Sequence, residues 1–345
     1  MTNPFLPEYS QPSRNRRVLL TNRPVGIPQA DQFSLDEAAL EPVGEGQFRV
    51  RNLYLSVDPA QRGWSNEGAN YSDAVALGGV MRALAVGVIV ESRHADFPVG
   101  LHVYGWFGWQ DYAVAGPEAL MTRIDSVAAP LSAYAGVLGM NGLTAYLALT
   151  MLGRPRVGDT VLVTTAAGAV GSIVGQLARA AGCRVVGLTG DDDKVARCTS
   201  RFRYDAAANY KAGDLSESVA AMAPQGVDVF FDNVGGPILD TVIRAMNVAG
   251  RIVQCGTAST ANWYPVPTGL RNEREVLMRR LQWGGFVIFD HAADYPAALA
   301  HLAPLVADGS LVHDEDISAG FEAAPGAIAR LYAGENEGKS LIFVG

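Results

Sequence analysis

The sequence predicts an α/β protein that combines a doubly wound parallel sheet with a separate, barrel-like antiparallel β region. From about residue 129 to 310, apolar β-branched runs alternate with helix-patterned segments, and a turn of small residues joins the first such strand to its helix. Before that stretch, residues 1–128 contain short strand candidates broken by Pro and Gly. A chain of 345 residues that is 49% hydrophobic is long enough for two such domains.

Short β-branched runs punctuated by Pro and Gly are typical of antiparallel barrels. The candidates in the N-terminal region are 16–21, 47–57, 83–91, 101–104 and 112–115. A final strand at 338–344 is expected to return to this first domain and so to close a cleft between the two. The predicted domains are therefore 1–128 with 311–345, and 129–310.

The central region alternates strictly between strands and helices. The expected strands begin at Val161 and continue at 184–189, 207–210, 227–232 and 250–255. The expected helices are 172–181, 192–201, 214–223 and 237–246. Such alternation predicts right-handed crossovers and a parallel sheet, whose ligand lies at the carboxyl ends of the strands.

The turn after the first of these strands has the spacing of a dinucleotide-binding loop, with Gly168 and Gly171 in place and Ala166 at the first glycine position. Small residues allow close backbone approach, and the helix N-terminus attracts a pyrophosphate. A buried strand–turn–helix without a ligand remains an alternative for the turn alone. The surrounding strands favour the cofactor.

Composition excludes several classes of function. The net charge of −8 and the lack of a Lys/Arg run argue against a nucleic-acid partner. Residues 126–153 carry no charge, but they contain Pro130 and several glycines, so we expect buried helices passing between domains and no membrane span. The N-terminus lacks the pattern of a signal peptide.

Cysteine and histidine usage points to a cytoplasmic protein without a metal. Cys183, Cys198 and Cys255 are odd in number and form no CxxC pair, which favours reduced thiols in the cytoplasm. Cys183 and Cys255 lie in strand-like runs, which favours inert core positions for these two. The five histidines are scattered and form no ligand pair, so no metal site is predicted.

Several stretches together resemble the medium-chain dehydrogenase/reductase superfamily, and within it the zinc-independent prostaglandin/leukotriene reductases and alkenal double-bond reductases. They lie in order along nearly the whole chain: 51–59 with Arg62-Gly63, 138–146, 166–178, 231–236, 254–256 and 334–339. The resemblance implies a GroES-like β-barrel catalytic domain, a Rossmann domain that binds NADP(H), and a homodimer. Zinc-containing relatives carry ligands where this chain reads Ser56-Val-Asp58 and Leu77–Ala83, so the resemblance also implies no metal.

The same resemblance, carried over residue by residue, implies a cofactor site. Gly168, Ala169, Val170 and Gly171 would meet the pyrophosphate, and Lys194 and Tyr210 would hold the adenosine 2′-phosphate. Asn233 would lie beside the cofactor, and Asn336 would reach back to it from the returning tail. Backbone groups of Cys255, Gly256, Thr257, Phe286, Val287 and Ile288 would line the nicotinamide side, and Gly190 is also expected to bind the cofactor.

The preference for NADP over NAD rests on the end of the second strand. An NAD site usually has an acid there, but Leu188-Thr189-Gly190 has none, and Lys194 suits a phosphate. Three carboxylates, Asp191–Asp193, would oppose a phosphate. The alternative is that they serve the next helix, which we prefer for Asp192 and Asp193.

The chemistry predicted is reduction of an activated C=C bond in a small hydrophobic enone or enal, with hydride added to the β-carbon. Ala261 stands where the family has a tyrosine, and Tyr264 is the candidate catalytic substitute. The candidate substrate pocket is Arg62, Trp64, Arg82, Trp106 and Trp263. For the aromatic residues core packing is the alternative, and for Arg62 it is bracing of a loop through Asp58. Quinone reduction and non-catalytic NADPH binding are alternative functions.

Overall fold

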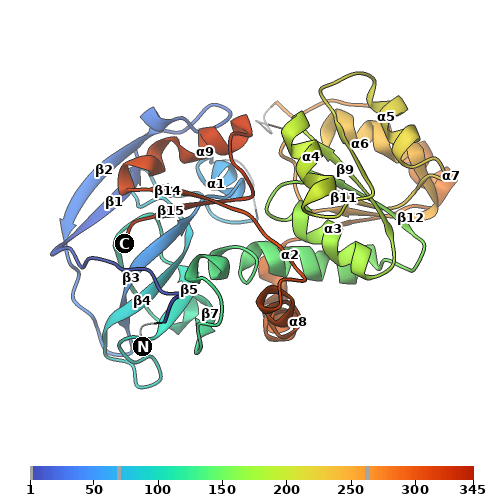
Figure 1. The fold of residues 1–345 in the computed structure, drawn as a ribbon. Helices are drawn as coiled ribbons and strands as arrows, with labels where there is room; N and C mark the ends of the chain where they lie inside the picture. Colours follow the sequence, from blue (N-terminus) through green and yellow to red (C-terminus); the bar gives the residue numbers. More distant parts are fainter. Residues whose placement is uncertain (1–2, 68–70, 261–264) are drawn as a thin grey trace. The chain divides into compact units, whose positions relative to one another are not determined.

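The computed structural model describes residues 3–67, 71–260 and 265–345 (Figure 1). The contacts between residues divide the chain into two compact units. The first, called here the β unit, comprises Met1–Gly139 and Glu315–Gly345. The second, the α/β unit, comprises Met140–Asp314.

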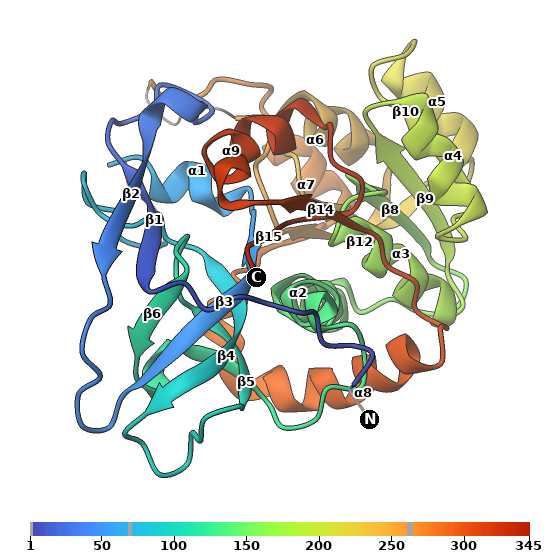
Figure 2. The ribbon, with the colours of Figure 1, turned by 60° about the vertical axis from the view of Figure 1, so that its left-hand side comes forward.

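The β unit is built on a largely antiparallel sheet with the order β14-β15-β3-β4-β5-β7, in which β6 pairs with β3 (Figure 2). Strands β1 and β2 form a separate antiparallel pair. The strands are β1 (Arg14–Leu20), β2 (Phe33–Ala39), β3 (Phe48–Ser56), β4 (Leu84–Ser92), β5 (His102–Trp106), β6 (Tyr112–Ala115), β7 (Leu120–Ile124), β14 (Glu315–Ala319) and β15 (Lys339–Phe343). The helices are α1 (Ala60–Trp64) and α9 (Ala324–Ala333).

The tail returns to the β unit, as the sequence predicts. Strand β15 pairs antiparallel with β3, with Leu341 opposite Ser56. Strands β2, β7 and β14 have no counterpart among the predicted strands. Strand β2 alternates between more buried and more exposed residues, and it pairs only with β1. It contains the adjacent acids Asp36 and Glu37, so its sequence lacks the hydrophobic pattern by which strands are predicted.

The α/β unit contains a parallel sheet with the order β10-β9-β8-β11-β12-β13. Its strands are β8 (Thr160–Thr164), β9 (Arg184–Thr189), β10 (Ala206–Asn209), β11 (Val227–Asp232), β12 (Met246–Gln254) and β13 (Gln282–Gly285). Its helices are α2 (Met140–Ala148), α3 (Gly171–Ala180), α4 (Asp192–Ser200), α5 (Leu215–Met222), α6 (Gly236–Val242), α7 (Glu273–Arg279) and α8 (Tyr295–Ala307). The predicted doubly wound sheet is confirmed. Strand β13 escapes sequence prediction because Gln-Trp-Gly-Gly contains no β-branched residue.

The strand order fixes where a ligand binds. The chain runs outward from β8 through β9 to β10, and then returns to β11 on the other side of β8 and runs to β13. Crossovers leave β8 and β11 in opposite directions, which creates the switch point of a doubly wound sheet. The carboxyl ends of β8 and β11 are therefore the expected ligand edge.

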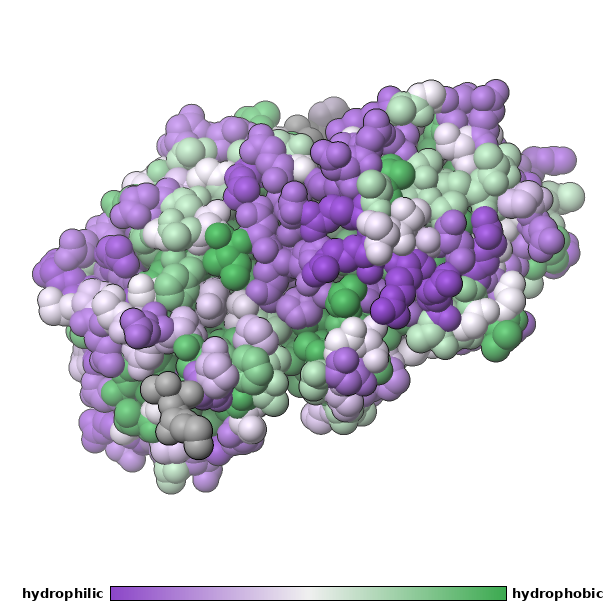
Figure 3. All heavy atoms as spheres, in the orientation of Figure 1, coloured by the Kyte–Doolittle hydropathy of each residue, from purple (hydrophilic) through white to green (hydrophobic). Residues whose placement is uncertain are grey.

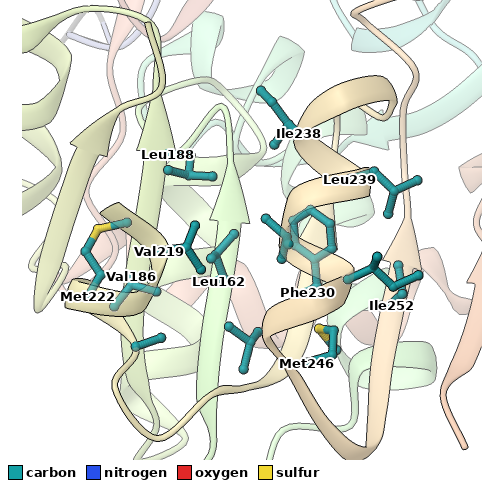
Figure 4. Close-up of a cluster of buried hydrophobic side chains, with 14 of the residues drawn as sticks. Leu162, Val186, Leu188, Val219, Met222, Phe230, Ile238, Leu239, Met246 and Ile252 are labelled. Carbon is teal, nitrogen blue, oxygen red and sulfur yellow. The ribbon is translucent and has the colours of Figure 1, made fainter. Parts of the chain in front are cut away.

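The core of the α/β unit is a row of residues in register across four strands (Figure 4). Leu162 pairs with Val186 on one side and with Phe230 on the other, and Phe230 pairs in turn with Ile252. Side chains from α5 and α6, such as Val219 and Ile238, pack against this face. The residues of this row are apolar because helices cover them, as is usual at the centre of buried parallel strands.

The uncharged stretch 126–153 forms short helical segments and α2, in which Leu143, Ala145 and Ala148 are fully buried. The prediction of buried helices is confirmed. Within the part of the chain that the structure describes, no helix is both long and apolar enough to cross a bilayer. On the face seen in Figure 3, polar and apolar residues are interspersed.

Candidate functional site

The turn between β8 and α3 folds tightly on itself. A Cβ atom on Gly171 would lie 2.3 Å from the carbonyl oxygen of Thr165, and one on Gly168 would lie 3.1 Å from the same atom. The turn therefore closes only with glycine at 171. This geometry presents the N-terminus of α3 to a ligand and fits a dinucleotide pyrophosphate.

The missing first glycine has a structural explanation. Ala166 is fully buried, and its backbone N–H donates to the Leu188 carbonyl on the neighbouring strand β9. A Cβ atom on Gly187 would lie 2.6 Å from the Cβ of Ala166. Glycine on the adjacent strand thus provides the space that glycine in the turn would otherwise provide.

Tyr204 holds the start of α3 in place. Its hydroxyl donates to the Gly171 carbonyl at 2.7 Å, and a Cβ on Gly175 would lie 2.2 Å from its ring. Burial raises the pKa of Tyr204 well above its ordinary value, so the hydroxyl remains a donor. No local sequence pattern indicates this role of Tyr204, because its partners Gly171 and Gly175 lie about 30 residues earlier, in α3.

A hydrogen-bonded brace joins the carboxyl ends of β8, β11 and β12. The fully buried Asp232 carboxylate accepts from Thr164 Oγ1 at 3.0 Å, from Gln254 Nε2 at 2.9 Å, and from the backbone N–H groups of Val234 and Gly235. Burial raises the pKa of Asp232, although these four donors oppose it. We call Thr164, Asp232 and Gln254 the strand-end brace. It was not predicted.

The brace positions two predicted cofactor segments. Asn233 donates its backbone N–H to Thr164 Oγ1 at 2.7 Å and its amide to the Thr164 carbonyl at 2.8 Å. The N–H groups of Cys255 and Gly256 donate to the Asp232 carbonyl. A Cβ on Gly256 would lie 2.6 Å from the Asn233 carbonyl oxygen, so these segments touch directly. The predicted contacts of Asn233 and Cys255–Thr257 with the cofactor stay predictions.

The stretch 286–288 follows β13 at the same edge of the sheet. Phe286 donates its N–H to the Gln254 carbonyl at 3.0 Å, and its ring stacks on His291 with centroids 4.8 Å apart. Tyr295 holds the Ile288 carbonyl through its hydroxyl at 2.9 Å. With the Phe286 ring buried, backbone groups are what this stretch offers a ligand at the strand ends.

The end of β9 carries the predicted adenosine site. Asp191 is the N-cap of α4: its carboxylate accepts from the Lys194 N–H at 2.7 Å and lies 3.5 Å from Lys194 Nζ. Asp192 and Asp193 lie in the first helical turn, as preferred in the sequence analysis, but the cap itself is Asp191. Asp192 accepts from the Asn209 amide at 2.9 Å. Two of the three acids therefore have local partners.

In the β unit, the described residues of the predicted pocket lie on α1 or contact it: Arg62 and Trp64 are in the helix, and Trp106 and Arg82 lie against Trp64. Trp64 is only 1% exposed, and its ring packs edge-on against the ring of Trp106 with the two ring centroids 5.4 Å apart. The Arg82 guanidinium lies 6.0 Å from the Trp64 ring and donates to the Asp73 carbonyl. The Arg62 guanidinium lies 4.8 Å from the Tyr332 ring. Trp64 is thus a core residue of this unit, whereas Trp106 is half-buried. Trp263, Ala261 and Tyr264 lie outside the described residues.

Asp58, named as a possible partner of Arg62 in the alternative in which Arg62 braces a loop, has other partners in the structure. The Asp58 carboxylate instead binds Lys339 Nζ at 2.6 Å and accepts from the Ser56 hydroxyl. Lys339 and Asp58 are both almost fully buried, and Lys339 also donates to the Val57 carbonyl. Ser56 and Asp58 occupy the stretch that holds a metal ligand in zinc-containing relatives. Among described residues, no group of three or more His, Cys, Asp or Glu is arranged to hold a metal ion.

The side-chain amide of Asn336, a predicted cofactor residue, donates to the Gly338 carbonyl at 2.8 Å.

Comparison with known proteins finds matches for both units and for nearly the whole chain. Residues 16–122 match the N-terminal domain of oxidoreductase family, and residues 169–303 match the zinc-binding dehydrogenase family. The 2-alkenal reductase (NADP(+)-dependent) of Nicotiana tabacum is 36% identical over 96% of this chain and 97% of its own length. Prostaglandin reductase 1 of Sus scrofa is 36% identical over 92% of this chain and 95% of its own.

A solved structure agrees with these sequence relatives. CurA from Vibrio vulnificus in complex with NADPH superposes with a TM-score of 0.90 at 35% identity, and the match covers 96% of this chain and 99% of that one. The glycine turn and the N-terminus of α3 are features typical of a fold that binds a dinucleotide. This chain therefore belongs to the alkenal and prostaglandin reductase family of the medium-chain dehydrogenase/reductase superfamily, and it is an NADP(H)-dependent oxidoreductase.

Proposed function

We propose that this protein is an ene reductase that reduces the activated C=C bond of small hydrophobic α,β-unsaturated aldehydes and ketones without a metal. Bound NADPH supplies a hydride to the β-carbon, and a proton then adds to the α-carbon. The observation that carries the proposal is the full-length similarity to a protein named as a 2-alkenal reductase. A 2-alkenal is an aldehyde whose C=C bond is conjugated to the carbonyl group.

The described residues supply binding and orientation for this reaction. The α3 N-terminus is proposed to bind the pyrophosphate through Gly168–Gly171. The strand-end brace holds Asn233 and Cys255–Thr257 in register beside it, because Asp232 bonds to both segments. Such fixed backbone geometry favours hydride transfer, which depends mainly on position and on exclusion of water.

Substrate binding is proposed to use the residues around α1 together with Trp263. The half-buried Trp106 offers an apolar face, and the buried Trp64 packs edge-on against its ring and so fixes its position. Arg62 and Arg82 each lie against an aromatic ring, and Arg82 also binds a backbone carbonyl. These contacts restrict both side chains, so we expect them to shape the pocket rather than to bind an acidic substrate.

The substrate carbonyl oxygen becomes enolate-like during the reaction and requires a hydrogen-bond donor. We propose Tyr264 for this role. Tyr264→Phe is expected to lower kcat about 100-fold, in line with loss of one oxyanion donor, while the NADPH dissociation constant stays unchanged. Stopped-flow single-turnover measurements check this, and an unchanged rate of hydride transfer excludes Tyr264 as the donor.

The reaction class is tested with NADPH and a substrate panel of 2-alkenals, enones, quinones and saturated ketones. We expect turnover of 2-alkenals and enones, with the saturated carbonyl compound as product. NADPH deuterated at C4 should place the label on the β-carbon, as mass spectrometry of the product will show. Turnover of quinones alone would replace this proposal by the quinone reductase alternative, and turnover of saturated ketones alone would contradict it.

We further propose a homodimer in the cytoplasm. Strand β13 is an edge strand that pairs with β12, and exposed apolar residues lie on it and on the preceding helix α7: Leu277, Met278 and Trp283. Exposed edges and apolar patches of this kind favour association. The three cysteines are free thiols, which suits a reducing compartment. Light scattering and microscopy of a tagged protein test the two statements.

A further inference from the structure

Lysine is unusually rare in this chain, and its placement is uneven. The sequence has 27 Lys and Arg residues, of which only three are lysines, Lys194, Lys211 and Lys339, so that 24 are arginines. Lys339 is buried against Asp58 in the β unit. The other two lysines belong to the α/β unit, one in the first turn of α4 and the other just after β10.

The side chains that follow β10 converge on the end of β9. A Cβ atom on Gly190 would lie 3.2 Å from the Tyr210 hydroxyl and 3.4 Å from Lys211 Nζ. The Lys211 ammonium lies 5.8 Å from the centre of the Tyr210 ring. The Tyr210 hydroxyl and the Lys211 ammonium group therefore both lie next to Gly190. Gly190 stands at the strand end where a dinucleotide fold places the adenosine ribose.

Local hydrogen bonds fix this arrangement. The Lys211 N–H donates to the Asn209 amide oxygen at 3.0 Å, and the Asn209 amide nitrogen donates to Asp192 at 2.9 Å. Asn209 thus ties the start of the Lys211 side chain to α4 and engages one of the three acids. Lys211 itself is exposed, so its ammonium is accessible to a ligand.

Charge balance requires a second cation. A phosphate monoester carries a charge of about −1.5 to −2 at neutral pH. Lys194 is the predicted partner, but its ammonium lies 3.5 Å from Asp191, which offsets much of its charge. With Asp192 and Asp193 close by, Lys194 alone leaves the site too negative for a dianion.

We propose that Lys211 is the second cation that binds the 2′-phosphate of NADP(H), opposite Lys194 and above Gly190, with the Tyr210 hydroxyl as a donor between them. Lys211 is then a specificity-determining residue, which favours NADP(H) over NAD(H) despite three neighbouring aspartates. The proposal concerns cofactor choice and does not depend on which substrate is reduced.

Calorimetric titration without any substrate tests the proposal. Lys211→Met should raise the dissociation constant for NADP⁺ roughly tenfold, in line with loss of one charged hydrogen bond, and should leave that for NAD⁺ within twofold. Adenosine 2′-monophosphate should show the same loss, and adenosine 5′-monophosphate should not. Lys211→Arg should bind NADP⁺ nearly as well as the native protein, because the charge is kept.

Arg274→Met on α7 is the matched control, since it removes the same charge from an exposed position of the same unit. It should leave the dissociation constant for NADP⁺ unchanged. Equal weakening of NADP⁺ and NAD⁺ by Lys211→Met, or no weakening of either, would overturn the proposal. These binding measurements remain informative even if the proposed ene reduction fails.

The scarcity of lysine permits a second, direct measurement. Reductive methylation with ¹³C-formaldehyde labels the lysines and the N-terminus, so the NMR spectrum contains few methyl signals. The Lys211 signal, assigned through its absence in Lys211→Arg, should shift when NADP⁺ is added and stay in place with NAD⁺. A shift of the Lys194 signal alone would contradict the proposal.

Discussion

Asp232 and Asp111 are both fully buried carboxylates, but they have different kinds of hydrogen-bond partner in the two units. Asp232, in the α/β unit, is surrounded by neutral donors: a hydroxyl, a side-chain amide and two backbone N–H groups. Asp111, in the β unit, binds the guanidinium groups of Arg16 at 2.7 Å and Arg51 at 3.1 Å. Burial raises the pKa of Asp232, whereas the hydrogen bond to Asp111 raises the pKa of Arg16.

The difference separates residues that build the site from residues that build the fold. The donors to Asp232 belong to segments at the expected ligand edge of the sheet, so the brace sets the positions of groups that are proposed to meet the cofactor. Arg51 instead reaches the Val344 carbonyl at 2.6 Å and the Ser10 carbonyl at 2.9 Å, and thereby joins the two ends of the chain to β3. The comparison predicts that changes in the ion cluster reduce stability alone, and that changes at the ligand edge reduce cofactor affinity.

The largest effect is expected for Arg51→Met. This change leaves Asp111 buried with one partner fewer, and breaking a buried ion pair in this way costs about 3–5 kcal/mol of unfolding free energy. Urea denaturation measures the loss. The NADPH dissociation constant of the folded variant should stay within about twofold of the native value, a change worth less than ~0.5 kcal/mol.

Arg14→Met is the matched control, since Arg14 pairs with Glu37 while both side chains are more than half exposed. An exposed pair contributes about 0–1 kcal/mol, so this variant should be nearly as stable as the native protein. A marked fall in NADPH affinity for Arg51→Met would remove the distinction between the two carboxylates.

The next largest effect is expected for Gly171→Ala, which tests the backbone part of the site. The added Cβ would lie 2.3 Å from the Thr165 carbonyl oxygen, so the turn must open and move the α3 N-terminus. We expect NADPH affinity to fall about 100-fold, equivalent to ~2.7 kcal/mol, while circular dichroism shows a retained fold. Gly326→Ala in α9 is the control, because its Cβ meets nothing within 4 Å. Native affinity in Gly171→Ala would show that the turn tolerates a side chain.

The sequence predicts the glycine turn and the strand before it because both signals are local. The turn from Ala166 to Gly171 lies within six residues, and β8 is a fully buried strand whose centre, Val161–Val163, is apolar. Short or charged strands were missed, β13 because it lacks β-branched residues and β2 because of its acids. The Lys339–Asp58 pair was also missed, because its members stand 281 residues apart and no local pattern connects them.

The third prediction compares the two ends of β11. Asp232→Asn replaces an acceptor by an amide beside the Gln254 amide, which is expected to cost about 1–3 kcal/mol of stability. It should also weaken NADPH binding about tenfold, equivalent to ~1.4 kcal/mol, because Asn233 and Gly256 shift.

Asp228→Asn is the matched control at the opposite end of the strand, where Asp228 accepts from the Thr160 N–H and the Asn247 amide. It should lose stability and keep affinity, and equal affinity losses would refute a positioning role for Asp232.

Tyr204, the strand-end brace and Lys211 show the limit of sequence reasoning about the site. Each acts through a residue that lies on another strand or helix, such as Gly171 for Tyr204 and Gly190 for Lys211. The resemblance to a family provided positions expected to touch the cofactor. The residues that hold those positions are far apart in the sequence, and only the three-dimensional fold brings them into contact.

The smallest effect on function is expected from the cysteines. Burial raises the pKa of Cys183 to about 11 and the pKa values of Cys198 and Cys255 to about 12. The thiolate is the reactive form, so at pH 8 alkylation by iodoacetamide should be roughly 100-fold or more slower in the native protein than in urea. Because the folded pKa values are raised, the native rate should keep increasing about tenfold per pH unit beyond pH 9, where an ordinary thiol levels off. Mass spectrometry resolves the three sites, and a Cys255 rate that levels off near pH 9 would show that its thiol faces water at the ligand edge.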